Sequence, residues 1–389
     1  MVEEQVITHT QDLAHADLQV EVVRSLERFN SLGAEWDRLV DRWGVDRVFL
    51  SHAWFRSWWE AFGGGRELHV VTVRSRGELV AAAPMMRTRS GRFGLNVDSI
   101  EAIYNHHTPR YDFIVGNNQD PRFYKAIWDK LIKDRGSEMI VLAQVPDASQ
   151  TIPILEKFAK HNGWLRGQWM APSSPFVPLG CDYATFFNSL KGGSRYNLRK
   201  RYDKLRKAGP VDIEVVSSIG AVREAMEDGL RIEAAAWKGD EGTAILCDPA
   251  VAEFYTRLAE REAELGQLRL SFLRVAGKRI AFSYLLRSRK RLYAVKIGYD
   301  PKYHAYSPGN MLLNLVLQDA CAEGIEEYDF LGCDDEWKFE WTKEKRDHRW
   351  LFLFRNQVRP RLLHYLKFSV IPAVKPGLKA LCTYLPGRA

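Results

Sequence analysis

The sequence is poor in the features that mark exported, membrane-spanning and metal-binding proteins. Its five cysteines are an odd number without any close pair, so neither a disulfide framework nor a zinc ribbon is indicated. No apolar run reaches the roughly 18 to 20 residues of a membrane span, and the N-terminal MVEEQVITHTQDLAHADLQVEVV has no apolar core of signal-peptide length. We therefore expect a cytoplasmic protein in a reducing compartment, without a bound metal.

Acidic residues are missing from the last part of the chain. From His348 to Ala389 there is no Asp or Glu but there are eight basic residues: Arg349, Arg355, Arg359, Arg361, Lys367, Lys375, Lys379 and Arg388. Once these eight charges are taken from the net charge of +7, the rest of the chain carries −1. The surplus positive charge therefore belongs to this tail, and the basic pI does not indicate nucleic-acid binding by the whole protein.

Apolar and aromatic residues, in contrast, are plentiful. Hydrophobic residues make up 46% of the 389 residues and aromatic residues 12%, including 12 Trp. This composition is typical of a globular protein with large cores or stacking surfaces. The length exceeds one ordinary core and fits two domains of roughly 150 to 200 residues each.

An internal repeat supports a two-domain organisation. The segment LHVVTVRSRGELVAAAP, from Leu68, aligns without gaps on LRLSFLRVAGKRIAFSY, from Leu268, and each copy reads as two strands joined by a Gly-containing turn. Tyr111-Asp112-Phe113 recurs as Tyr328-Asp329-Phe330, and SHAWFRSWWEAF and AVAEFYTRLAERE both read as amphipathic helices. We predict an α/β (α+β) protein built from two copies of one unit; the alternative is that the match reflects only generic hairpin patterning.

The repeat also sets the predicted boundaries. We expect a flexible N-terminus at 1–19, a first domain at 20–175, a second domain at 176–356 and a basic amphipathic tail at 357–389. The Pro- and Ser-containing segment from Pro172 to Gly180 is the expected connection.

The second copy has a loop and helix that could hold an anion. Its predicted elements are strands at 268–275, 279–287 and 292–298, a helix from about 311 to 323 and a strand at 327–331. Uncommitted N–H groups around Ser307, Gly309, Asn310 and Met311, together with the helix dipole, would favour a phosphate. An ordinary helix cap is the alternative.

This part of the sequence resembles a known family. The stretch GYDPKYHAYSPGNMLLNLVLQDACAEGIEEYDFLGCDDEWKFEW is similar to the acyl-CoA-binding core of the GNAT superfamily and, within it, to the BioF2-like (CelD/BcsL-type) acetyltransferase domain. The matching positions are Gly298-Tyr299-Asp300, Ser307-Pro308-Gly309, Tyr328-Asp329-Phe330, Trp337-Lys338 and Trp341. The resemblance covers about residues 30 to 355. It implies tandem GNAT-like domains, each a mixed twisted sheet flanked by helices, with the acceptor side in the first and the acyltransferase in the second.

The resemblance implies acyl-CoA as co-substrate, no metal, and an amine acceptor. Donor-binding residues would be Ser307, Gly309, Asn310 and Tyr299. The usual GNAT pyrophosphate loop has several glycines, whereas this loop has Gly309 alone. That departure leaves room for the related Fem-type transferases, which share a tandem GNAT-like fold and take their acyl group from aminoacyl-tRNA. A non-catalytic accessory protein of envelope polysaccharide biosynthesis is a third alternative.

An acyltransferase of this type needs a base to remove a proton from the attacking amine. The candidates are Glu233, Asp329 and His304. Glu233 is preferred because it precedes Trp237 by four residues on an expected helix, so that one face presents both; a solvated helix is the alternative. Asp329 ends an apolar strand and needs a partner, which Lys338 could provide unless Lys338 contacts the donor. A structural ion pair is the other interpretation.

The acceptor side is expected to include His106, His107 and Asp112 of the first copy and Trp237 of the second. An ordinary polar loop is the alternative for the two histidines. An adjacent His pair cannot readily chelate one metal from a helix face, and no other ligand spacing supports zinc.

Two basic segments remain. Lys191 to Lys207 contains eight Lys or Arg residues with Leu198, Tyr202 and Leu205 at helical spacing, which predicts either a solvated amphipathic helix or a phosphate contact. The tail 357–389 interleaves apolar and basic residues and suits peripheral docking on the anionic inner face of a membrane, or packing across the domain junction. With membrane docking, a membrane amino-lipid or sphingoid-type base becomes the preferred acceptor, in lipid metabolism.

Overall fold

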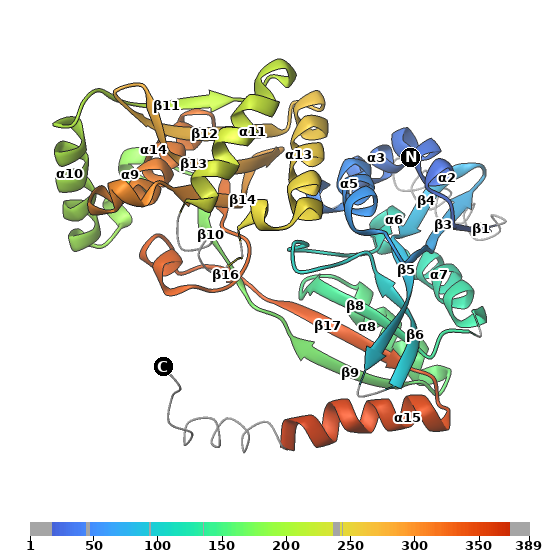
Figure 1. Ribbon diagram of the computed structural model, residues 1–389. Coiled ribbons are helices and arrows are strands. Elements are labelled where there is room, and N and C mark those ends of the chain that lie inside the picture. The colour runs from blue at the N-terminus through green and yellow to red at the C-terminus, as the bar shows by residue number, and fades with distance from the viewer. Residues whose placement is uncertain are drawn as a thin grey trace, which may run out of the picture. The chain divides into compact units, whose positions relative to one another are not determined.

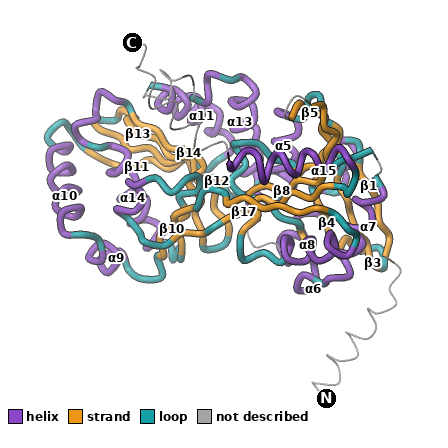
Figure 2. Tube along the Cα trace, turned by 90° about the horizontal axis from the view of Figure 1, so that it is seen from below, coloured by secondary structure: helices purple, strands orange, loops and turns teal. Residues whose placement is uncertain are grey.

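The computed structural model describes residues 18–43, 47–92, 95–134, 136–235, 242 and 244–373 (Figures 1 and 2). Contacts divide the chain into two units. Unit 1 comprises residues 1–52, 65–171 and 348–389, and unit 2 comprises residues 53–64 and 172–347. Each unit thus takes in a segment distant in sequence: strand β17 (His348–Phe354) belongs to unit 1, and all but the first residue of helix α5 (His52–Phe62) belongs to unit 2.

Unit 1 has two sheets. Its elements are β1 (Leu18–Val23), α2 (Leu26–Ser31), α3 (Gly33–Trp43), α4 (Arg47–Leu50), β2 (Glu67–Leu68), β3 (Val70–Ser75), β4 (Glu78–Ala83), β5 (Met85–Arg92), β6 (Leu95–Ala102), β7 (Ile114–Val115), α6 (Gly116–Gln119), α7 (Pro121–Lys133), β8 (Met139–Pro146), α8 (Thr151–His161), β9 (Leu165–Met170), β17, α15 (Val358–Tyr365) and the π-helical turn η5 (Leu366–Val370). The strand orders are β1-β3-β4-β7 and β2-β5-β6-β8-β17-β9. The β6–β8 pair is parallel, and β17 is antiparallel to both of its neighbours.

Unit 2 has one seven-stranded sheet in the order β11-β12-β13-β14-β15-β10-β16. Its elements are α5, β10 (Ser174–Pro178), α9 (Tyr183–Ser189), α10 (Gly192–Arg206), β11 (Val211–Val216), α11 (Ile219–Ala234), η2 (Ile245–Cys247), α13 (Pro249–Glu264), β12 (Leu268–Val275), β13 (Lys278–Ser288), β14 (Arg291–Tyr299), η3 (Pro301–Tyr306), α14 (Pro308–Ala322), β15 (Glu327–Asp329), η4 (Glu336–Glu340) and β16 (Lys345–Arg346). Figure 1 shows α11 and α13 side by side along this sheet, and α9 and α10 near α14.

The predicted repeat is confirmed for the hairpins. Strands β3 and β4 in unit 1, and β12 and β13 in unit 2, form antiparallel pairs whose registers shift at the matching pairs Val73/Arg74 and Leu273/Arg274. The turns also match, because Gly77 and Gly277 have φ of 82° and 77° and each follows a residue with positive φ. Two consecutive positive φ values are what a tight two-residue hairpin turn requires, which explains the glycine in both copies.

The second part of the predicted repeat is wrong. Tyr328 and Asp329 lie in β15, but Tyr111 to Phe113 lie in an irregular segment before β7. The strand of unit 1 that pairs in parallel, as β15 does in unit 2, is β8. Three apolar and acidic residues in a row do not distinguish a strand from a buried loop, so this match arose without structural equivalence.

Asp-Pro pairs begin two of the long helices. Asp120 and Asp248 cap α7 and α13 by accepting a hydrogen bond from a first-turn N–H, and the following prolines take the first helical position. Proline is suited to that position because the N–H it lacks would have no acceptor within the helix. Within the described ranges, no helix combines the length and apolar character needed to cross a lipid bilayer.

His69 of unit 1 is a buried histidine whose protonation is unfavourable. Burial lowers its pKa to about 4, the positive charge of Arg24 adds to this shift, and Asp134 opposes it. The unfolded chain takes up a proton near pH 6.5, which the native state does not. Above pH 6.5, His69 therefore does not lower the free energy of unfolding. Below pH 6.5, the free energy of unfolding falls as the pH is lowered towards 4, by at most about 3 kcal/mol.

We accordingly expect His69→Gln to flatten the pH dependence of the free energy of unfolding between pH 4 and 6.5. Urea denaturation across this range measures the effect. The same change at the exposed His161 is the control and should leave the pH dependence of the native protein unchanged. A native-like slope in the His69 variant would contradict the assignment.

Candidate functional site

The two central strands of unit 2 separate after a short paired segment. The parallel register of β14 and β15 covers only three residues of each strand, ending at Tyr293 and Asp329. Strand β14 nevertheless stays paired with β13 as far as Tyr299. The register shift between β13 and β14 leaves one extra residue, Val295, on β14. A bulge of this kind bends and twists its strand, and β15 itself ends at Asp329, so the pairing stops at Tyr293.

Glu233 lies against the separated part of β14. It is the penultimate residue of α11 and 1% exposed, and its carboxylate accepts a hydrogen bond from the N–H of Ile245 at 3.1 Å. A Cβ on Gly298 of β14 would lie 2.6 Å from the Glu233 Cα, so only glycine allows this approach of helix and strand. Burial raises the pKa of the Tyr255 phenol, and the negative charge of Glu233 adds to the rise. Glu233 is thus an enclosed carboxylate and does not serve as a solvated helix residue.

The start of α14 offers two free backbone donors, and sequence reasoning expected four. The Ser307 N–H donates to the carbonyl of His304, and the Met311 N–H donates to that of Ser307. The expectation was therefore wrong for Ser307 and Met311. In the described part of the chain, the N–H groups of Gly309 and Asn310 have no acceptor. A Cβ on Gly309 would lie 3.7 Å from Tyr299, an ordinary contact, so the loop does not require glycine there.

A polar pocket of about 130 Å³ adjoins this helix start. Its lining residues come from α10, α14, the end of η4 and the residues that directly follow α9 and η4: Leu190, Ser194, Asn197, Leu198, Arg201, Asn310, Glu340 and Trp341. Trp341 is 5% exposed, and its indole N–H finds no hydrogen-bond acceptor among the described residues. A buried donor without an acceptor is unfavourable unless a ligand or water fills the role. Arg201 brings a positive charge and Glu340 a negative one.

Asp329 forms an ion pair with Arg346. The fully buried Asp329 carboxylate lies 2.9 Å from the Arg346 guanidinium and also accepts a hydrogen bond from the N–H of Leu331 at 2.9 Å. Arg346 also pairs with Glu327 and stacks on Phe176 at 3.7 Å from the ring centroid. The structural ion pair left open by the sequence is therefore present, with Arg346 as the cation.

Lys338 is not the partner of Asp329, so that expectation was wrong. Its ammonium group donates to the carbonyls of Leu331 and Cys333, at 3.0 and 2.6 Å, and pairs with Asp335 at 2.9 Å. These contacts close the loop that follows β15. Lys338 thus has a structural role in this loop.

His304 and Tyr299 lie together near the start of α14. The exposed His304 belongs to η3, and its Nδ1 is 3.3 Å from the hydroxyl of Tyr299, the last residue of β14. Asp300 caps η3 by accepting from the N–H of Lys302. The loop between β14 and α14 therefore presents an imidazole and a phenol to solvent.

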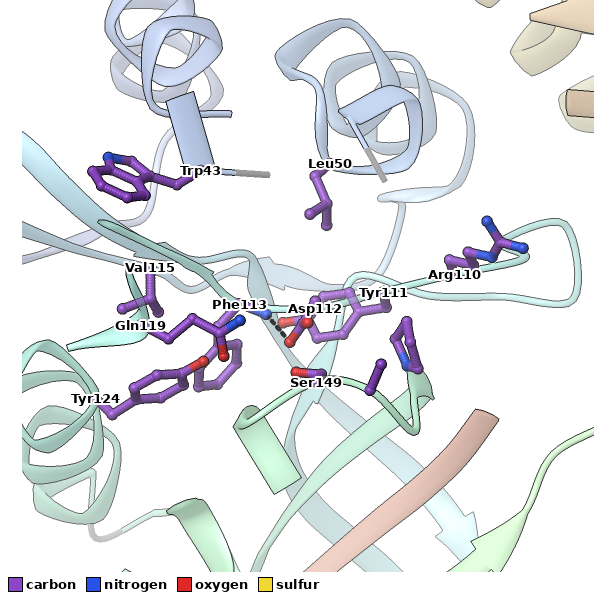
Figure 3. Close-up of a pocket in the computed structure, with 12 residues that line it drawn as sticks. Trp43, Leu50, Arg110, Tyr111, Asp112, Phe113, Val115, Gln119, Tyr124 and Ser149 are labelled. Atoms are coloured by element: carbon purple, nitrogen blue, oxygen red, sulfur yellow. Dashed lines mark hydrogen bonds between the residues drawn. The ribbon is translucent and has the colours of Figure 1, made fainter. Parts of the chain in front are cut away.

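The acceptor residues expected in the first copy lie in unit 1. Asp112 lines a cavity of about 60 Å³, where its carboxylate accepts hydrogen bonds from the Thr151 hydroxyl and the N–H of Phe113 (Figure 3). The same figure shows Gln119, Tyr124 and Ser149 around this carboxylate. His106 and His107 belong to a turn closed by Asn105 and Thr108 and do not line the cavity. Trp237 lies outside the described residues.

For three residues of these sites, the sequence provided either no signal or no specific role. Arg346 follows the motif-rich region without a recognisable pattern, and Trp341 was a motif position without an assigned role. Arg201 was one of eight basic residues in Lys191 to Lys207 with nothing to single it out. That segment forms α10 as predicted, with Leu198 and Leu205 buried. No group of three or more His, Cys, Asp or Glu side chains in the described ranges could hold a metal ion.

Comparisons with known proteins agree with the fold. Residues 192–339, all within unit 2, match the family model described as an acetyltransferase (GNAT) domain. FemX shares 13% identity with a TM-score of 0.57, over 85% of this chain and 96% of FemX. The C-terminal domain of a proposed lysylphosphatidylglycerol synthetase from Agrobacterium fabrum shares 15% identity with a TM-score of 0.51, over 88% and 96% of the two chains. L-PGS from Bacillus licheniformis shares 11% identity with a TM-score of 0.51, again over 88% and 96%.

A search of curated proteins found no match. At these identities the solved structures show a shared fold and nothing further. Residues 192–339 of unit 2 are thus similar to a GNAT acetyltransferase domain, and the chain has a mixed α/β fold of twisted sheets flanked by helices, as predicted. The narrower BioF2-like assignment stays a prediction.

Proposed function

We propose that this protein is an N-acyltransferase that transfers an acyl group from acyl-CoA to an amine, with the donor bound in the opening between β14 and β15. The separation of the two strands after Tyr293 is the observation that carries this proposal. In a central strand, alternate residues direct their N–H and C=O groups to each neighbouring strand. Beyond Tyr293, β14 no longer pairs with β15, and we place an extended ligand along this side of β14.

The donor phosphates would lie at the start of α14. The free N–H groups of Gly309 and Asn310 lie at the positive end of the helix dipole, which favours negative charge. The adjoining pocket adds the Arg201 guanidinium and the indole N–H of Trp341. Backbone N–H groups, a guanidinium and an indole N–H, from three separate segments, support a phosphate site more strongly than a helix start alone.

The reaction would be a direct transfer. A neutral amine attacks the thioester carbonyl, a C–N bond forms, the C–S bond breaks, and the departing thiolate takes a proton. The base removes one proton from the nitrogen, which becomes positively charged as the C–N bond forms. Glu233 is our preferred base because it is a buried carboxylic residue whose Cα and Cβ lie against Gly298 of β14. His304 is an exposed alternative, whereas Asp329 is bound to Arg346.

Calorimetric titration of CoA and acyl-CoA into the protein tests the donor. We expect saturable binding, and we expect Arg201→Glu to weaken it by about tenfold or more, because a charged hydrogen bond is replaced by repulsion. Lys207→Glu is the matched control, since Lys207 caps the same helix, is exposed and does not line the pocket. Absence of any binding heat at millimolar CoA would overturn the CoA assignment.

Aminoacyl-tRNA is the second candidate donor. The similarity to FemX and the exposed basic residues of α10 favour it. A polynucleotide contacts many cations at once, so Arg201→Glu and Lys207→Glu should then weaken binding similarly and its salt dependence should be steep. Adding CoA would then have no effect on the transfer activity. A protein without catalytic activity would release no acylated product with either donor. Product mass spectrometry with a panel of acyl-CoAs, and with aminoacyl-tRNA, measures this.

We place the acceptor side in unit 1. Asp112, and the turn that carries His106 and His107, are candidates for binding an amine within unit 1. A membrane amino-lipid or sphingoid-type base is the proposed acceptor class, and the same mass spectrometry with lipid and soluble amines in competition would distinguish it from a soluble amine.

A further inference from the structure

Helix α15 of unit 1 exposes an apolar stripe. Val358, Leu362 and Tyr365 are 86%, 48% and 58% exposed, and their spacing of four and three residues places them on one face of the helix. Pro360 and Leu363, on the opposite face, are buried, and the helix contacts β9 and β17 (Figure 1). Large apolar side chains thus line the outer face of a helix whose inner face is already packed.

The packing of α15 fixes which face points outward. Arg359 forms an ion pair with Glu138 at 3.2 Å. In the following turn, Phe368 packs so closely on β9 that a Cβ on Gly167 would lie 2.2 Å from its ring. Both contacts would break if the helix rolled to bury the stripe. The exposed face therefore belongs to the folded unit.

Arginines border the stripe on both sides. At about 100° of rotation per residue, Arg361 lies on one side of the stripe and Arg359 on the other. Glu138 neutralises Arg359, whereas Arg361 is exposed. Arg166 of β9 is exposed beside the helix, and its carbonyl contacts the ring of His364 at 3.0 Å. Because the sequence from 348 to 389 contains no acidic residue, helix α15 itself carries a surplus of positive charge.

We propose that this face of α15 docks on an anionic lipid bilayer. Val358, Leu362 and Tyr365 enter the headgroup region while Arg361 contacts lipid phosphates. A bilayer fits this surface because arginine can bury its aliphatic stem beside an apolar stripe and keep its charge at the phosphates, and tyrosine favours the membrane–water interface. The inference rests on α15 alone and does not depend on the proposed transferase activity.

Co-sedimentation of the full-length protein with vesicles tests the proposal. We expect binding to vesicles of phosphatidylcholine and phosphatidylglycerol in equal parts, and little binding to pure phosphatidylcholine. Leu362→Asp should lower the partition coefficient by about tenfold or more, because a charge replaces an inserted side chain. Arg361→Glu should lower it by about thirtyfold on the anionic vesicles, since the charge near the surface changes by two.

Matched control variants show whether vesicle binding depends on α15 specifically. Leu246→Asp in unit 2 changes a leucine that is 50% exposed and should leave vesicle binding unchanged. Charge reversal of Lys200 on α10 tests the other basic surface and should have little effect. Thermal melting confirms folding, and Val358→Asp replaces Leu362→Asp if the latter does not fold.

Several outcomes would overturn the proposal. The native protein could fail to bind anionic vesicles at low salt, or Leu362→Asp could bind as well as the native protein. Loss of binding on removal of residues 374–389, with no effect of the α15 variants, would assign docking to another segment. Light scattering that shows a native dimer converted to a monomer by Leu362→Asp would assign the stripe to a second copy of the chain.

Discussion

Replacing Arg346 by leucine is expected to destabilise unit 2 by about 3 kcal/mol or more. The change leaves the buried carboxylates of Asp329 and Glu327 without this cation and removes the stacking on Phe176. An isolated charge in a buried site is far more costly than the original pair is stabilising, which is the reason for the size of the effect. Urea denaturation with a probe in unit 2 measures it.

Two companion variants show whether the buried charge is the cause. Arg274→Leu removes an exposed ion pair to Asp212 and should cost less than about 1 kcal/mol. The triple change Glu327→Gln, Asp329→Asn and Arg346→Met removes all three charges of the Arg346 ion pairs and should recover much of the lost stability. A deficit of Arg346→Leu no larger than that of Arg274→Leu would refute this interpretation of the cluster.

Glu233→Gln is expected to reduce kcat by about 10² to 10⁴-fold while leaving donor affinity unchanged. Glutamine keeps the shape of the side chain and an oxygen that can accept the hydrogen bond from Ile245, but it cannot take a proton from the amine. Steady-state kinetics with a donor that binds in the calorimetric experiment, and an amine that yields a product, separate kcat from KM.

Glu262→Gln is the matched control for Glu233. Glu262 lies on α13, is equally buried, and has no assigned role in transfer. If both variants lose activity and melt at a lower temperature, packing of the two helices explains the loss. If Glu233→Gln keeps native kcat, the base is another group, and His304 becomes the next candidate.

Sequence reasoning was most successful where a local rule decides the structure. The hairpins of both copies were predicted because alternating side chains and a glycine turn depend only on neighbouring residues. The strands of the second copy, the helix that became α14 and the basic helix α10 were placed within a few residues for the same reason. The amphipathic character of SHAWFRSWWEAF also predicted helix α5.

The assignment of segments to units needed the tertiary structure. The amphipathic pattern of α5 does not specify which apolar surface its apolar face contacts. Only the fold shows that Trp54 and Phe62 pack on Phe254 of α13. β17 has an alternating, apolar-rich strand pattern, and its place between β8 and β9 depends on residues some 200 positions earlier in the chain. Pattern specifies the kind of element but does not specify its neighbours.

For the candidate site, too, some features follow from local sequence and others only from the fold. The sequence by itself determined that a strand, a Ser-Pro-Gly loop, a helix and a second strand follow one another from Tyr293 to Lys338, because each has a local signature. It also determined the acid-free tail. Only the tertiary structure decided that Arg346 pairs with Asp329, that Lys338 closes a loop, and that Trp341 and Arg201 meet at the start of α14. Charge pairing and burial depend on distances through space, which residue types and their spacing along the chain do not fix.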